Sequence, residues 1–149
     1  MKLERKPLAL VVDDDPDLRT LVEMVVASSG ADVLCAGDGE AALDLALLGR
    51  PDLLVLDVML PGALDGLAVC RRLKAELPGC FVVIVSGRSL ESDVLDAERS
   101  GADAYFVKPV SLLELGSLVE RVLRRRASVA LGAPPAGRAG HLHPHVYKG

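Results

Sequence analysis

The sequence predicts an α/β fold, a doubly wound parallel sheet of five strands with helices on both faces. Short apolar runs alternate with segments of helical periodicity, and glycine or proline marks the connections between them. The apolar runs are also unbroken, as expected of strands that are buried on both faces. A repeated strand-helix order winds into a parallel sheet with helices on either side, because its crossover connections are right-handed.

The strands are predicted from apolar runs of four or five residues. The four clearest runs are Leu8–Val12, Leu53–Leu56, Phe81–Val85 and Ala104–Val107, and Asp32–Cys35 is a shorter and weaker candidate. All are far too short to cross a bilayer, which takes about 20 residues of helix.

The helices are predicted from apolar residues that recur at i, i+3, i+4 and i+7. This stripe is complete in residues 18–25 and 115–122, and partial stripes occur in 45–48, 69–73 and 90–97. The repeated sequence Ser-Gly-Ala-Asp at 29–32 and 100–103 predicts helices that end in glycine before a strand, since glycine adopts the left-handed conformation without a Cβ clash.

Composition narrows the function classes. The chain has 149 residues and a net charge of −4, which fits one domain and argues against direct nucleic-acid binding. The N-terminal sequence MKLERKPLAL has no signal-peptide core. The cysteines Cys35, Cys70 and Cys80 lack metal-binding spacing and fit reduced core thiols. We therefore expect a cytoplasmic protein that is not inserted in a membrane.

The composition changes after Arg126. Residues 127–149 contain four glycines and three prolines and no helical stripe, which predicts a folded domain over 1–126 followed by a flexible C-terminal tail. The alternating His141, His143 and His145 in this tail allow metal binding, but without a fourth ligand a solvated tail is the better interpretation.

Five polar or charged side chains, which are costly to bury, follow directly after apolar runs: Asp13, Asp14, Asp57, Ser86 and Lys108. The carboxyl ends of parallel strands meet at one edge of the sheet, where open α/β sheets bind their ligands. Three carboxylates at one edge repel each other and call for a divalent cation, and magnesium prefers such oxygen ligands. A lysine and a hydroxyl beside that cation suit a phosphoryl group.

The segments VVDDDPDLR, LLVLDVMLPG, DGL, VVIVSGRS and YFVKP, in this order, resemble the receiver domain of two-component response regulators from about Leu8 to Arg126. The resemblance implies a flavodoxin-like (βα)5 fold with strand order 2-1-3-4-5. It also implies a signalling switch, which catalyses only its own phosphorylation and dephosphorylation and is otherwise no enzyme.

By this resemblance, Asp57 accepts the phosphoryl group from a phosphohistidine on a sensor histidine kinase or histidine phosphotransfer protein. Asp14 corresponds to the direct Mg²⁺ ligand, Asp13 to a ligand acting through water, and Met59 to the donor of a backbone carbonyl. A shift of one residue would make Asp14 and Asp15 the pair, but Asp15 before a proline is the better candidate for a helix start.

Lys108 corresponds to the lysine that holds the phosphoryl oxygens, with a cis bond to Pro109. Ser86 corresponds to the switch hydroxyl and Tyr105 to the aromatic that turns inward, although a partly buried edge aromatic fits Tyr105 nearly as well. The resemblance further implies that Met59 and the pair Gly87-Arg88 line the path of the hydrolytic water.

Partners would recognise the surface formed by the last strand and the last two helices, about residues 90–100 and 111–126. The implied partners are a kinase or phosphotransfer protein, a downstream protein and, after phosphorylation, a second copy of the chain. Since no DNA-binding output sequence follows Arg126, we expect a stand-alone receiver.

The chain departs from the family in its loop 62–64, which is one residue longer than the usual spacing before Asp65-Gly66. Two other functions remain open. Asp13-x-Asp15 after a strand resembles the nucleophile motif of haloacid-dehalogenase-like phosphatases, although the chain lacks that family's further regions. A phosphorylation-independent interaction module is the other.

Overall fold

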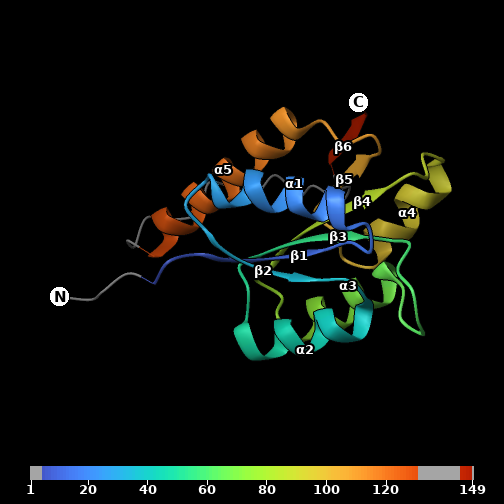
Figure 1. Ribbon diagram of the computed structural model, residues 1–149, viewed down its shortest axis with the longest axis horizontal. Coiled ribbons are helices and arrows are strands. Elements are labelled where there is room, and N and C mark those ends of the chain that lie inside the picture. The colour runs from blue at the N-terminus through green and yellow to red at the C-terminus, as the bar shows by residue number, and fades with distance from the viewer. Residues whose placement is uncertain (1–4, 131–144, 149) are drawn as a thin grey trace.

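The computed structural model describes residues 5–130 and 145–148, in which six parallel strands form one sheet and five helices cover its two faces (Figure 1). The strand order is β2-β1-β3-β4-β5-β6. Along the chain the elements are β1 (Leu8–Val12), α1 (Pro16–Ala27), β2 (Asp32–Ala36), α2 (Gly39–Gly49), β3 (Leu53–Asp57), α3 (Gly66–Glu76), β4 (Phe81–Ser86), α4 (Glu91–Arg99), β5 (Ala104–Val107), α5 (Leu112–Ala130) and β6 (His145–Lys148).

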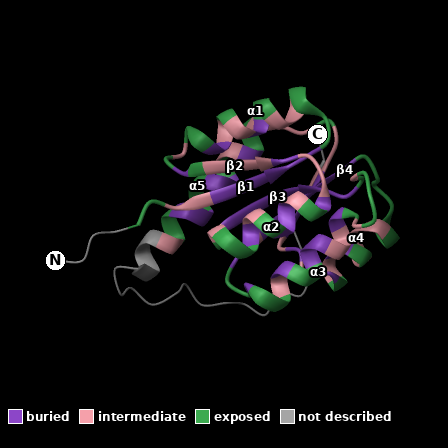
Figure 2. Ribbon diagram, turned by 60° about the horizontal axis from the view of Figure 1, so that its bottom comes forward, coloured by how far each residue is buried: buried purple, intermediate pink, exposed green. Residues whose placement is uncertain are grey.

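The central strands are buried on both faces, as their unbroken apolar sequences predict (Figure 2). In β1, Leu10 and Val12 pack with residues of α2 and α3, whereas Ala9 and Val11 pack with residues of α1 and α5. Burying one such side chain contributes about 1.5–3 kcal/mol, so two apolar cores hold the sheet between two layers of helices.

Local capping signals set the helix boundaries. The side chains of Asp15, Asp38 and Asp65 accept hydrogen bonds from the first backbone N–H groups of α1, α2 and α3. Each such cap contributes about 0.5–2 kcal/mol. At the other ends of α1 and α4, Gly30 and Gly101 have φ of 94° and 97°, which confirms the predicted glycine-ended helices.

The predicted number of five strands is wrong, because His145–Lys148 adds a sixth. Its partner is β5, which would otherwise leave an open edge of unpaired backbone groups. The order 2-1-3-4-5 is present within the larger sheet. This strand was not predicted because four residues in a glycine- and proline-rich segment show no periodic pattern of apolar residues.

The segment predicted as a tail therefore contains regular structure at both ends. Helix α5 continues to Ala130, four residues past the expected boundary, and β6 lies near the C-terminus. His141 and His143 lie outside the described residues, and His145 is the first residue of β6. Among the described helices, none has the length and apolar character needed to cross a bilayer.

Candidate functional site

The strands β1, β3, β4 and β5 end at the same edge of the sheet. The register pairs Val12 with Leu56, Asp57 with Val85 and Ser86 with Val107. The residues that end or follow these strands are therefore neighbours: Asp13 and Asp14 after β1, Asp57 in β3, Ser86 in β4 and Lys108 after β5. The structure brings together all five residues singled out from the sequence.

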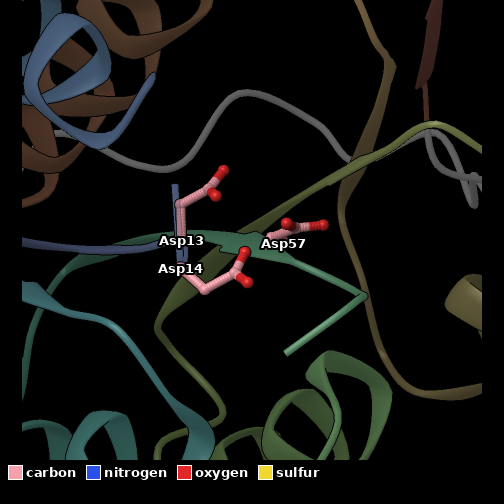
Figure 3. A group of neighbouring side chains, drawn as sticks. All are labelled: Asp13, Asp14 and Asp57. Carbon is pink, nitrogen blue, oxygen red and sulfur yellow. The ribbon is translucent and has the colours of Figure 1, made fainter. Parts of the chain in front are cut away.

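Three carboxylates form the centre of the site (Figure 3). One ligand oxygen from each of Asp13, Asp14 and Asp57 lies within 4.8 Å of the others. Asp13 and Asp57 are buried, and Asp14 is exposed. Burial raises the pKa of Asp13, and the charges of Asp57 and Asp14 raise it further, while the hydrogen bond from Asp15 N–H and the charge of Lys108 act in the opposite direction. The cluster thus concentrates negative charge that a cation would relieve.

Lys108 is the one cationic side chain that forms an ion pair with these carboxylates among the described residues. Its Nζ lies 3.1 Å from Oδ2 of Asp57 and 3.6 Å from Oδ2 of Asp13. Burial lowers the pKa of Lys108, but the hydrogen bond and charge of Asp57 and the charge of Asp13 outweigh it, so that the pKa is raised. The lysine is held charged beside Asp57. The Lys108-Pro109 bond is cis, as the resemblance implies.

The backbone around Asp57 fixes its carboxylate. Oδ1 accepts a hydrogen bond from Met59 N–H at 3.2 Å, and Oδ2 faces Lys108. Gly66 at the start of α3 packs so closely that a Cβ there would overlap the carbonyl oxygen of Asp57 and lie 2.7 Å from the Cα of Val58. The close approach of α3 therefore requires glycine at this position.

Ser86 and Tyr105 meet at the main chain of Arg88. The Ser86 hydroxyl is fully buried and accepts from Arg88 N–H at 3.1 Å, and the Tyr105 hydroxyl donates to the Arg88 carbonyl at 2.7 Å. Tyr105 is 1% exposed, so its ring lies inside the protein. Burial raises the pKa of its hydroxyl. The structure thus links the two residues expected to act as a switch.

The oxygen-rich cluster fits magnesium, which takes one or two carboxylates and keeps several waters. Asp15 is not part of it. The Asp15 carboxylate accepts from the N–H groups of Asp17 and Leu18 at the start of α1, at 3.0 and 3.4 Å. Asp15 thus caps α1, as its position before a proline predicts, whereas Asp13 and Asp14 lie in the carboxylate cluster.

Leu64, the last residue of the longer loop 62–64, is packed against α2. A Cβ at Gly39 in α2 would lie 2.5 Å from the Leu64 carbonyl oxygen and 2.8 Å from its Cβ. Asp65 then caps α3 by accepting from Ala68 N–H at 2.9 Å. The additional residue is accommodated without disturbing the capped start of α3.

Arg19 was not recognised from the sequence. Its guanidinium donates to the Asp13 carbonyl oxygen at 3.0 Å and so anchors the backbone that presents Asp13 and Asp14. The available signal was its position one turn into α1, directly after the acidic segment. A similar contact joins Arg88 to Met59, whose sulfur lies 3.4 Å from the Arg88 guanidinium.

The described geometry matches a known family. Residues 9–120 match the family model described as the response regulator receiver domain. The chain belongs to the response regulator receiver family. The receiver is 42% identical over 121 residues to the transcriptional regulatory protein AfsQ1 of Streptomyces coelicolor, covering 80% of this chain and 52% of that protein.

Other relatives agree. The transcriptional regulatory protein PrrA of Mycobacterium tuberculosis is 40% identical over 140 residues, covering 94% of this chain and 60% of its own. The receiver thus spans roughly half of these relatives' length. Among solved structures, the receiver domain of the Francisella response regulator 1452 superposes with a TM-score of 0.74 at 30% identity, covering 81% of this chain and 99% of the other.

Proposed function

We propose that this receiver is a phosphorylation-activated switch that accepts a phosphoryl group on Asp57 from a phosphohistidine donor in the presence of Mg²⁺. The observation that carries the proposal is the carboxylate cluster with Lys108 beside it. Asp57 is the one member of the cluster that also lies within 3.1 Å of a lysine, so the positive charge of Lys108 is in place to bind the negative charge of an incoming phosphoryl group. The proposal includes a cytoplasmic location, which accords with the family.

In the proposed transfer, an oxygen of Asp57 forms a bond to phosphorus while the P–N bond of the donor phosphohistidine breaks, leaving an acyl phosphate on Asp57. Asp13, Asp14, Asp57 and the backbone carbonyl of Met59 would hold Mg²⁺, which when bound neutralises charge on nucleophile and donor. Lys108 then holds a phosphoryl oxygen by a charge-assisted hydrogen bond.

The proposed switch follows from the contacts of Ser86. A serine hydroxyl accepts and donates at once, so Ser86 can keep the Arg88 N–H and turn its own proton toward the phosphoryl group. Because Tyr105 binds the same Arg88 segment, movement there reaches β5 and the start of α4. The surface of α4, β5 and α5 is the proposed contact for a downstream protein or a second copy.

The test is labelling with acetyl phosphate and Mg²⁺, followed by intact mass measurement. We expect wild type to gain one phosphoryl group and Asp57→Asn to gain none. Asp44→Asn, which replaces an exposed carboxylate on α2, is the matched control and should be labelled like wild type. Labelling of Asp57→Asn would place the nucleophile elsewhere and refute the proposal.

Asp57→Asn and a further variant, Asp13→Asn, address the other two functions. Hydrolysis of a generic phosphate ester that is lost in Asp13→Asn and retained in Asp57→Asn would indicate a phosphatase. Partner binding that is identical in wild type, labelled wild type and Asp57→Asn would indicate an interaction module that does not depend on phosphorylation.

A further inference from the structure

The outer edge of β5 is covered by the last strand of the same chain. β6 runs parallel to β5 and pairs all four of its residues in register, from Ala104 with His145 to Val107 with Lys148. Figure 1 shows β6 at the end of the sheet, beyond β5. The backbone groups at this edge are therefore not open to another strand.

Side chains reinforce the pairing. The rings of Phe106 and Tyr147 are stacked, with centroids 4.2 Å apart and planes 10° from parallel. The hydroxyl of Tyr147 accepts a hydrogen bond from the Arg121 guanidinium of α5 at 3.3 Å. Tyr147 also packs against the core between the sheet, α1 and α5. One residue of β6 thus contacts both β5 and α5.

We propose that the β5 edge is a strand-docking site, which the chain's own β6 occupies in cis, so that a protein partner using this edge must first displace β6. The inference rests on the proposed function only in naming β5 as part of the surface that partners read. A competing segment would have to be an extended strand with an aromatic residue opposite Phe106, because the stack and the Arg121 contact select that side chain.

The β5 edge is directly connected to residues of the carboxylate site. β5 carries Tyr105 and is followed directly by Lys108, the ion-pair partner of Asp57. In the register, Val146 lies beside Tyr105. A strand bound at this edge therefore pairs with Tyr105 and with Val107, the residue directly before Lys108.

Hydrogen exchange of the 149-residue chain measures how strongly β6 protects the backbone of β5. In Tyr147→Ala the stack and the hydrogen bond are both lost, and we expect amide exchange in a peptide spanning residues 104–107 to rise about tenfold. Tyr147→Phe keeps the ring and should stay close to wild type. Leu48→Ala, at a residue 85% exposed on α2, is the control. Unchanged exchange of β5 in a folded Tyr147→Ala protein would overturn the proposal.

An engineered disulfide tests whether the strand beside β5 belongs to the same chain or to a second copy. Val107 and Lys148 are neighbours in the register, and adjacent strands lie about 4.8 Å apart, within reach of a disulfide. Oxidised Val107→Cys/Lys148→Cys protein should run as a cross-linked monomer on a non-reducing gel, with wild type oxidised in parallel. A cross-linked dimer would show that the strand comes from a second copy, and the absence of any cross-link would show that β6 does not occupy this edge. Either result overturns docking in cis. Neither readout requires phosphorylation, so a failure to label Asp57 leaves them intact.

Discussion

Removing one carboxylate from the cluster should stabilise the protein in the absence of Mg²⁺. Asp13 is the residue to change, because it is buried and its Lys108 contact, at 3.6 Å, is longer than that of Asp57. At an effective dielectric constant of about 20, two carboxylates within 4.8 Å repel by at least about 3.5 kcal/mol, and the lysine at 3.6 Å returns about 4.6 kcal/mol.

Repulsion from Asp57 and Asp14 together therefore exceeds the attraction to Lys108 by about 2 kcal/mol. Because Asp14 is exposed, solvent screens part of its repulsion, which leaves roughly 1 kcal/mol for Asp13→Asn. This corresponds to a melting temperature about 4 °C higher than that of wild type in EDTA. The asparagine oxygen can still accept from Asp15 N–H, so the turn is retained.

Magnesium should reverse this order. Bound to the three carboxylates at ten times its dissociation constant, it stabilises wild type by about 1.4 kcal/mol, and Asp13→Asn should gain little. Thermal unfolding of both proteins with EDTA and with a Mg²⁺ series measures both effects, and Asp44→Asn should follow wild type. A variant less stable than wild type in EDTA, or a wild type indifferent to Mg²⁺, would show that repulsion does not govern this site.

Three further predictions follow from individual contacts. Gly66→Ala should lose about 1–3 kcal/mol in urea unfolding through overlap with the end of β3, whereas Gly87→Ala, with nothing within 4 Å, should not. The pKa of Asp13 in the folded protein is raised above its ordinary value of 3.8, so the folded state binds this proton more tightly than the unfolded state does. Without Mg²⁺, the resulting stabilisation is fully present below pH 3.8 and is lost as pH rises through the folded pKa. Asp13→Asn should remove this dependence of stability on pH. Burial and a hydrogen bond to Glu23 raise the pKa of Cys35 to about 11, so Glu23→Gln should speed its reaction with Ellman's reagent at pH 8.

The fold was predictable because its signals are local. Apolar runs such as Leu53–Leu56 and helical stripes such as residues 115–122 each mark one element, and the caps at Asp15 and Gly30 mark boundaries. The strand order came from the family resemblance and agrees with the structure for five strands. The sixth strand was missed because its pairing depends on the β5 edge, which lies far away in the sequence.

By itself, the sequence determined which residues end each strand, and so that Asp13, Asp57, Ser86 and Lys108 share one edge. That conclusion needs only parallel strands, whose carboxyl ends point the same way. Only the tertiary structure decided the separations within the carboxylate cluster, the turn of Tyr105 toward Arg88, the support of Asp13 by Arg19 and the covering of β5 by β6. These depend on side-chain packing between distant segments, which no local pattern encodes.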